Sequence, residues 1–207
     1  MTRSQRLFIV FGLIAAAALG AWWAARFLKP PKPPVTLTHG TLLAPAHPVG
    51  ALDLIDQNGQ PFTQARFDGR WSLVYFGFTS CPMICPTTLA MLRDLAQRLE
   101  ALPPEARPQV ILITVDPQTD TPPVIGRYVA GFNPAFLGLT GTQAALDAVA
   151  QRFSVAFGRS ANGTIDHSST IYVVDPQGAL AAVFTPPQTV AAIADDYRQL
   201  VGLPAGY

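Results

Sequence analysis

The chain has 207 residues, a formal net charge of +1, and 49% hydrophobic against 13% charged residues. This length is sufficient for one domain with its own core plus an appendage. The near-zero net charge excludes the strongly basic surface of a nucleic-acid-binding protein, so we expect no nucleic-acid partner. The hydrophobic content is high for a soluble protein, and the excess lies at the N-terminus.

An uncharged apolar stretch begins the chain. Residues 7–25 contain no charged side chain. A helix of that length spans about 28 Å, close to the hydrocarbon thickness of a bilayer. A cleaved signal peptide would look similar, but the paired Trp22 and Trp23 suit an interfacial anchor better. We therefore expect residues 1–28 to be an uncleaved single-span membrane anchor.

A proline-rich segment follows the anchor. Lys29 to Pro34 reads Lys-Pro-Pro-Lys-Pro-Pro, which favours extended polyproline II and predicts a stiff linker over residues 29–48. His39 and His47 lie in this linker, and we expect both to be exposed loop histidines. Either an export signal or a signal-anchor would place the rest of the chain outside the cytoplasm, where disulfides form readily.

Residues 49–207 predict alternating strands and helices. Residues 51–62 alternate apolar with polar side chains and turn at Asn58-Gly59, which indicates a hairpin. Further strands are expected over 71–78, 109–115, 136–139, 170–174 and 179–185. Helices are expected over 86–102, after Pro123 to about 132, from the N-cap Thr142 to about 153, and over 189–200. This order implies a mixed sheet with helices on both faces, and it resembles a thioredoxin fold.

The two cysteines of the chain, Cys81 and Cys85, lie where the strand over 71–78 gives way to its helix. We expect Cys85 at or near the helix start, where the helix dipole lowers the pKa of a thiol. Two thiolates on such a turn suit reversible disulfide exchange or a soft metal. The plainer alternatives are a structural disulfide or two buried apolar cysteines, but a helix-opening loop is a poor place to bury a thiol.

His167 lies in the loop just before the strand over 170–174. In thioredoxin-like folds this loop lies beside the cysteine turn and usually carries a cis-proline. No proline occurs between Gly163 and Val174 here, and His167 stands near that position. Two thiolates and an imidazole form a three-coordinate site that suits Cu(I), or Cu(II) with a water or carbonyl added. A structural zinc would normally require a fourth protein ligand. The plainer interpretation of His167 is a polar surface residue.

These motifs together resemble the Sco (SenC) family, membrane-anchored copper chaperones for cytochrome c oxidase assembly. The matching stretches are residues 75–86 (Tyr-Phe-Gly-Phe-Thr-Ser-Cys-Pro-Met-Ile-Cys-Pro), 115–122 and 166–178. The resemblance covers roughly Val49 to the C-terminus and includes the preceding anchor. It implies that Cys81, Cys85 and His167 are copper ligands in a thioredoxin-like domain over 49–207.

The resemblance also implies a function and a location. The domain would deliver copper to, or reduce the cysteines of, the copper A site of cytochrome c oxidase subunit II. Other copper chaperones or thiol reductants would be further partners. The chain would span a bacterial inner (cytoplasmic) membrane once, with its C-terminal domain facing the periplasm. It would be a chaperone that exchanges ligands, not an enzyme with turnover, and a reversible disulfide between Cys81 and Cys85 would stop copper binding.

A thiol-disulfide oxidoreductase that acts on a partner's cysteines is the alternative. The fold and the helix-start thiol favour it, whereas the three-residue spacer between the cysteines and the missing cis-proline argue against it. A peroxidase fits less well, because no Thr-x-x-Cys arrangement with a nearby arginine is evident. His167 separates the first two functions, since copper binding requires it and disulfide exchange does not.

Two carboxylates in the stretch 115–122 have two interpretations each. Asp116, before a proline, is either a turn residue or a carboxylate behind the metal ligands that orients His167 or tunes the thiolates. Asp120 is either a helix N-cap or a carboxylate of the same supporting kind.

The remaining residues near the cysteines have plainer expectations. Met83 offers a soft thioether, although packing or exposure is the more common role. Tyr75, Phe76 and Phe78 are expected in the core and the cleft wall. We hypothesise that residues 157–165 form a mobile flap that lets His167 move in on metal binding.

Overall fold

The computed structural model describes residues 3–4, 12–13, 15–20, 22–23, 36–155, 157–159, 165–167 and 169–202. The chain divides into two units, Met1–Val35 and Thr36–Tyr207. The described residues of the first unit are helical, and among the residues that the structure describes no helix has the length and apolar character needed to cross a membrane. The anchor expected over residues 1–28 lies partly outside the described residues and stays a prediction.

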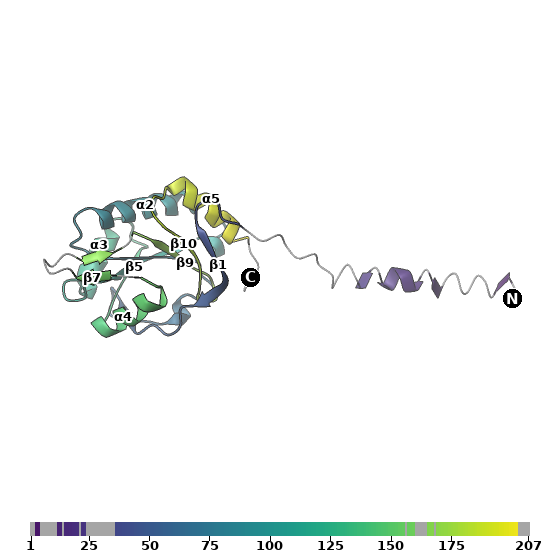
Figure 1. Ribbon diagram of the computed structural model, residues 1–207, viewed down its shortest axis with the longest axis horizontal. Coiled ribbons are helices and arrows are strands. Elements are labelled where there is room, and N and C mark those ends of the chain that lie inside the picture. Colours follow the sequence, from purple (N-terminus) through teal and green to yellow (C-terminus); the bar gives the residue numbers. More distant parts are fainter. Residues whose placement is uncertain are drawn as a thin grey trace. The chain divides into compact units, whose positions relative to one another are not determined.

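A mixed sheet of eight strands forms the centre of the second unit (Figure 1). Its strand order is β1-β10-β9-β4-β5-β6-β2-β3. The strands are β1 (Thr41–Pro48), β2 (Leu54–Asp56), β3 (Pro61–Phe62), β4 (Ser72–Gly77), β5 (Gln109–Thr114), β6 (Leu137–Thr140), β9 (Ile171–Val174) and β10 (Ala179–Phe184). A separate pair is formed by β7 (Phe157–Arg159) and β8 (Ile165–His167). The helices are α2 (Ile84–Leu99), α3 (Pro122–Ala130), α4 (Gln143–Arg152) and α5 (Val190–Leu200), with 3₁₀ turns at Gln64–Arg66 and Pro104–Ala106.

The sheet topology brings three distant segments to one edge. Strands β4, β5 and β6 are parallel, with Gly77 in register with Thr114. Strand β9 runs antiparallel to β4, with Ile171 in register with Tyr75. The loops after β4 and β5 and the segment before β9 therefore meet at the edge where β4 and β5 end, which we call the carboxyl edge. The opposite edge, where β4 and β5 begin, is the amino edge.

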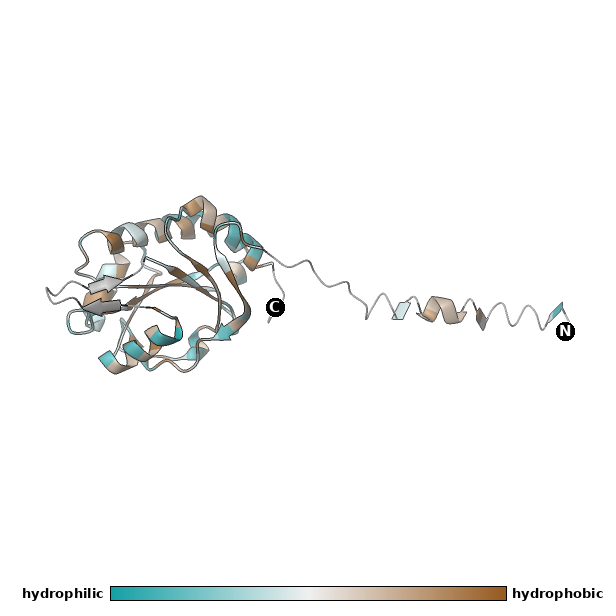
Figure 2. Cartoon of the chain, viewed as in Figure 1, coloured by the Kyte–Doolittle hydropathy of each residue, from teal (hydrophilic) through white to brown (hydrophobic). Residues whose placement is uncertain are grey.

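Helices cover both faces of the sheet. Figure 1 shows α2 and α5 on one side and α4 on the other, and α2 packs against α5. The side of α2 that faces the sheet carries four fully buried leucines at helical spacing, Leu89, Leu92, Leu95 and Leu99. Burying each one contributes about 2 kcal/mol. Figure 2 shows hydrophobic residues concentrated along the central strands, as expected for strands covered on both faces. The predicted mixed sheet with helices is confirmed.

Successive residues of β4 point to opposite faces of the sheet. On the α4 side, the rings of Phe76, Phe153 and Tyr172 pack edge to face with centroids 5.3 to 5.8 Å apart. Tyr75 is fully buried and points to the opposite side, toward α2. The expectation that Tyr75, Phe76 and Phe78 lie in the core is therefore confirmed, and their place in a cleft wall stays a prediction.

The helix boundaries differ from the predictions by two or three residues. Helix α2 begins at Ile84, two residues earlier than expected, because Pro86 fits the first helical turn, where its missing N–H has no intrahelical partner to lose. It ends at Leu99, three residues earlier than expected. The predicted N-cap Thr142 is confirmed, since its hydroxyl accepts a hydrogen bond from the amide of Ala145 at 3.2 Å.

The turns between β2 and β3 and between β9 and β10 are each closed by a buried aspartate. At the predicted Asn58-Gly59 turn, the Asp56 carboxylate accepts the amides two and four residues on at 2.8 and 3.0 Å, and Gly59 has φ +75°. Asp175 repeats this arrangement at 2.9 Å for both amides, with Gly178 at φ +72°. Glycine accepts this left-handed conformation without strain.

The structure corrects the linker boundary. Strand β1 pairs with β10, so residues 41–48 belong to the sheet and the linker expected over 29–48 is too long at its carboxyl end. The sequence over residues 41–48 does not predict this strand. The register of β1 shifts between Leu42 and His47, which breaks the alternation of side chains along it. His39 and His47 are both exposed as expected, although His47 lies in a strand.

A buried carboxylate fixes the start of the second unit. Asp196 of α5 is fully buried and accepts the backbone amides of Thr38, His39 and Gly40 at 2.9, 2.7 and 2.8 Å. Three donors around one carboxylate stabilise its charge inside the protein. This contact ties the chain that precedes β1 to the last helix.

Candidate functional site

The two cysteines lie at the carboxyl edge in different surroundings. Cys81 lies in the loop between β4 and α2 and is partly exposed, whereas Cys85 is the second residue of α2 and is fully buried. The two cysteines do not form a disulfide in this structure. The backbone N–H of Cys85 donates to the Cys81 sulfur at 3.4 Å, which brings the start of α2 against that sulfur.

The amides at the start of α2 lower the pKa of Cys81 and not that of Cys85. Partial burial of Cys81 opposes ionisation, but hydrogen bonds from the amides of Cys85, Met83 and Ile84 outweigh it and lower the pKa of the Cys81 thiol. These amides belong to the first turn of a helix, where N–H groups lack intrahelical partners. Cys81 is therefore the thiol that ionises first.

The surroundings of Cys85 correct the expectation for that residue. Burial raises the pKa of the Cys85 thiol to about 12, despite a hydrogen bond from the Tyr75 hydroxyl at 3.4 Å. The site is also closely packed, since a Cβ at Gly77 would lie 2.9 Å from the Cys85 sulfur. A position at the helix start does not lower the pKa of this thiol, because its side chain points into the core.

Tyr75 and Gly77 are the residues that sequence reasoning missed. Burial, and then the neighbouring Cys85, raise the pKa of Tyr75 far above its usual value, so its hydroxyl keeps its proton and remains a donor. Tyr75 and Gly77 are two apart on one strand and therefore share a face. The alternation of side chains along this strand is the sequence signal that could have identified them, because it places Tyr75 and Gly77 on one face just before the cysteine turn.

Asp120 connects the two loops of the carboxyl edge. Its fully buried carboxylate accepts the Thr79 amide at 3.0 Å, the Thr79 hydroxyl at 2.5 Å and the Thr114 hydroxyl at 2.6 Å. Helix α3 has its N-cap at Thr121, so the N-cap interpretation of Asp120 is wrong. The carboxylate instead fixes the strand end and the loop that leads to Cys81.

Asp116 shapes the same edge through its backbone. It is 7% exposed, its N–H donates to the Thr114 hydroxyl at 2.9 Å, and its carbonyl accepts the amide of Asp120 at 2.9 Å. These bonds fit the turn interpretation. A role for its carboxylate toward His167 or the thiolates stays a prediction.

The structure describes the backbone of His167 but not its side chain. His167 ends β8, in register with Phe157 of β7. It precedes Ile171 by four residues, and Ile171 pairs with Tyr75 near the carboxyl edge. Among the residues that the structure describes, no group of three His, Cys, Asp or Glu side chains could hold a metal ion. The expected ligand set of Cys81, Cys85 and His167 stays a prediction, and so does the flap, because residues 160–164 lie outside the described part.

A second phenol lies near the thiols. The Tyr128 hydroxyl on α3 is buried and has no hydrogen-bond partner within the described part of the chain. Burial, and then the neighbouring charges of Cys85, Cys81 and Asp120, raise the pKa of Tyr128. Its ring packs edge to face on Phe132 at 5.4 Å. The hydroxyl is therefore protonated and able to donate.

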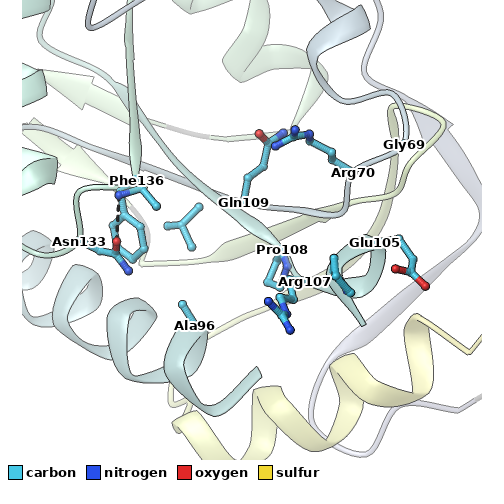
Figure 3. A pocket seen from close by; sticks show the side chains of 12 residues that line it. Gly69, Arg70, Ala96, Glu105, Arg107, Pro108, Gln109, Asn133 and Phe136 are labelled. Atoms are coloured by element: carbon cyan, nitrogen blue, oxygen red, sulfur yellow. Dashed lines mark hydrogen bonds between the residues drawn. The ribbon is translucent and has the colours of Figure 1, made fainter. Parts of the chain in front are cut away.

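The carboxyl edge and the amino edge differ in the side chains that they present to solvent. At the carboxyl edge, Met83 lies between the cysteines and is 72% exposed, as the plainer expectation had it. At the amino edge, a cavity of about 450 Å³ is bordered by Arg70 and Arg107 (Figure 3). Figure 3 shows Arg70 beside Gln109. No cysteine or histidine is among its described lining residues, so the chemistry of a thiol site belongs to the carboxyl edge.

The donor set at the carboxyl edge fits a soft metal. A thiol that ionises readily lies against a second thiol, and thiolate sulfur selects ions such as Cu(I). The Tyr75 hydroxyl supplies a hydrogen bond to the second sulfur, a contact of the kind that orients metal ligands.

Comparisons with known proteins agree with this geometry. The family model SCO1/SenC matches residues 41–202. An SCO2-like protein of Rickettsia prowazekii is 35% identical over 84% of this chain and 85% of its own length. The crystal structure of yeast Sco1 with copper bound superposes with a TM-score of 0.69 at 30% identity, over 77% of this chain and 92% of that one.

A further solved structure connects the fold with thiol chemistry. BsSco, described as a member of the Sco family of cytochrome c oxidase assembly proteins with a disulfide switch, superposes with a TM-score of 0.64 at 25% identity. The superposition covers 77% of this chain and 96% of BsSco. The extent of these matches shows that the chain belongs to the SCO1/SenC family.

Proposed function

We propose that this protein is a copper-binding chaperone in cytochrome c oxidase assembly, with Cys81, Cys85 and His167 as the copper ligands. The observation that carries the proposal is the asymmetric thiol pair at the carboxyl edge, one exposed and easily ionised, the other buried behind it. The copper-bound structure of yeast Sco1 and the oxidase-assembly description of BsSco support it.

The asymmetry assigns different steps to the two sulfurs. Copper is the cargo, and Cys81 is its first and last contact because only this sulfur reaches the surface. Cys85 must lose its proton when copper binds, and a thiol with a pKa raised to about 12 yields that proton only to a strongly bound metal. The Tyr75 hydroxyl stabilises the resulting thiolate by its hydrogen bond. In this proposal the raised pKa of Cys85 lowers the copper affinity at neutral pH and eases release, while Cys81 presents an accessible sulfur for exchange.

The proposed acceptor is the copper A site of oxidase subunit II. Copper would pass by ligand exchange from Cys81 to the cysteines of that site, or the reduced thiol pair would first reduce their disulfide. Residues 1–28 would anchor the chain in a bacterial inner membrane, with the domain facing the periplasm. Other copper chaperones or thiol reductants would reload or re-reduce it.

A second candidate function rests on the same asymmetry. As a thiol-disulfide oxidoreductase, the Cys81 thiolate would attack a partner disulfide and release one partner thiolate. Cys85 would then displace the second, so that the partner gains two electrons and two protons while Cys81 and Cys85 form a disulfide. The lowered pKa of Cys81 favours this reaction, and the disulfide switch described for BsSco is consistent with it.

Copper titration of a histidine variant separates the two functions. Cu(I) is titrated anaerobically, against a competing chelator, into the reduced full chain in detergent and into His167→Ala. We expect one-to-one binding that weakens by about 10-fold or more in the variant, a loss of roughly 1.4 kcal/mol. His47→Ala, an exposed histidine of β1, is the matched control and leaves the affinity unchanged. Equal affinities for His167→Ala and the parent chain would leave only a dithiol and favour the oxidoreductase.

A further inference from the structure

An apolar groove lies beside the cysteines. Its volume is about 390 Å³. Met83, which directly precedes α2, and Ile84 and Met91 of α2 form one wall, and Ser169, Pro187 and Gln188 contribute to the other; we call these six residues the Met groove. The chain has three methionines, and the two beyond Met1 both line this groove. Methionine side chains adapt to different partners, which makes them common at binding surfaces.

The exposure of this wall is unusual for the domain. Among the described residues of the second unit, the exposed large hydrophobic side chains are Met83 and Ile84, at 72% and 50% exposure. Leaving two such side chains in water forfeits the stabilisation that their burial would contribute. No described lining residue of the groove is charged. The groove therefore complements an uncharged, apolar surface and not an acidic or basic one.

The opposite wall contains an unsatisfied acceptor. The Gln188 side-chain amide donates to the Ser169 carbonyl at 2.8 Å, which fixes its orientation. Its oxygen, Oε1, is buried and accepts no hydrogen bond within the described part of the chain. A buried acceptor without a donor is unfavourable, so a rearrangement of this wall that supplies a donor is favoured. Ser169 lies two residues after His167, which joins this wall to the segment of the predicted third ligand.

We infer that the Met groove is the docking surface for an uncharged, apolar segment of the protein that exchanges copper or a disulfide with Cys81. The inference rests on the proposed function. A sulfur from the partner can reach Cys81 only by approaching the exposed loop in which Met83 lies, and the Met groove continues from that loop. The partner segment would cover Met83 and Ile84, the exposed part of the groove.

The experiment measures copper transfer between two proteins. The Cu(I)-loaded full chain in detergent is mixed anaerobically with the reduced, copper-free copper A domain of oxidase subunit II, and the second-order rate constant is measured from the copper content of that domain, separated at timed intervals. We expect Met91→Glu to lower this rate constant by about 10-fold, because a charge in an apolar interface must be desolvated. Gln97→Glu is the matched control, since it adds the same charge to an exposed position of the same helix, and we expect it to change the rate less than twofold.

Three readouts keep the docking surface separate from the copper site. The Cu(I) affinity and the urea midpoint of Met91→Glu should equal those of the parent chain, and Met91→Gln, a nearly isosteric variant, should give an intermediate rate. Raising sodium chloride from about 50 to about 500 mM should change the parent rate less than twofold, because screening acts on charges that the groove lacks.

The opposing results are distinct. An unchanged rate for Met91→Glu, or a steep salt dependence of the parent chain, would overturn the Met groove and leave the proposed function in place. A parent chain that binds no Cu(I), or binds it and transfers none, would overturn the proposed function and the docking surface with it.

Discussion

Hydrogen bonds at the carboxyl edge of the sheet hold a reactive sulfur and the loop before the other, whereas those at the amino edge join the starts of two strands and a nearby turn. At the carboxyl edge, the Tyr75 hydroxyl donates to the Cys85 sulfur and Asp120 holds the loop before Cys81. At the amino edge, the Gln109 side chain donates to the Arg66 carbonyl at 3.1 Å and the Ser72 hydroxyl at 2.9 Å. The two edges therefore differ in the chemistry of the groups that these hydrogen bonds hold.

This difference shows where variants will separate stability from function. A substitution at the amino edge removes hydrogen bonds that are distant from the cysteines, and it should lower only the free energy of unfolding. A change at the carboxyl edge removes similar contacts and also alters the position or charge of a sulfur. Matched pairs of variants, one from each edge, therefore test whether the carboxyl edge is the site.

The largest expected effect is the difference in reactivity between the two thiols. Iodoacetamide at pH 7.5 should modify Cys81 more than about 100-fold faster than Cys85, because only a thiolate reacts and Cys85 is buried with a pKa near 12. Because the pKa of Cys81 is lowered, its modification rate should stop rising with pH at a pH below the usual thiol pKa of about 8.5. Cys85 should stay protonated until near pH 12.

Mass spectrometry of tryptic peptides after timed quenching measures both rates over a pH series. Cys81→Ser is the control, and it should leave the chain almost unmodified in the native state. Equal rates for the two thiols in the folded chain would contradict the assignment of Cys81 as the entry sulfur.

The next effect comes from the carboxylate that joins the two loops of the carboxyl edge. Asp120→Ala leaves the Thr79 and Thr114 donors without their acceptor and should lower the free energy of unfolding by about 3 kcal/mol. Gln109→Ala, its counterpart at the amino edge, should cost about 1 kcal/mol. Urea denaturation measures both values.

Copper affinity then separates the two variants. We expect Asp120→Ala to weaken Cu(I) binding, because the loop before Cys81 loses its anchor, and Gln109→Ala to leave it unchanged. A Gln109→Ala chain that loses copper affinity to the same extent would show that stability alone controls binding and would remove the distinction between the edges.

The regular parts of the fold could be predicted because local patterns specify them. The apolar run over 109–115 became the central strand β5, and the leucines of α2 became a buried helix face. Strand β1 could not be predicted, because its bulge breaks the alternation and its pairing partner is more than a hundred residues away. Asp196 was equally hidden, since three amides on a distant segment are what make its burial favourable.

The site was predictable in its composition and not in its electrostatics. The sequence places both cysteines at the start of a helix, but it does not say which sulfur the free amides reach. The answer depends on the direction of each side chain: Cys81 points at the amides, and Cys85 points under β4 toward Gly77. The role of Asp120 required the pairing of β4 with β5, which brings Thr79 and Thr114 to one carboxylate.

The smallest expected effect compares two phenols. Tyr75→Phe removes the hydroxyl that donates to the Cys85 sulfur, and Tyr197→Phe removes one that donates to the Ala106 carbonyl at 2.9 Å, near the amino edge. Each variant loses the hydrogen bond that its hydroxyl donates, and Tyr75→Phe also loses the contact with the Thr88 hydroxyl, so each should lower the free energy of unfolding by about 1 kcal/mol.

Only Tyr75→Phe should also weaken Cu(I) binding, by about 3- to 10-fold, because the Cys85 thiolate in the complex loses a donor that stabilises its charge. Competition with a chelator measures the affinity, and the sulfur-to-copper absorption of the Cu(II) form should shift in Tyr75→Phe alone. If both variants kept the parent affinity and spectrum, the Tyr75 contact would be structural, like that of Tyr197. The two edges would then differ only in the cysteines themselves and in Asp120.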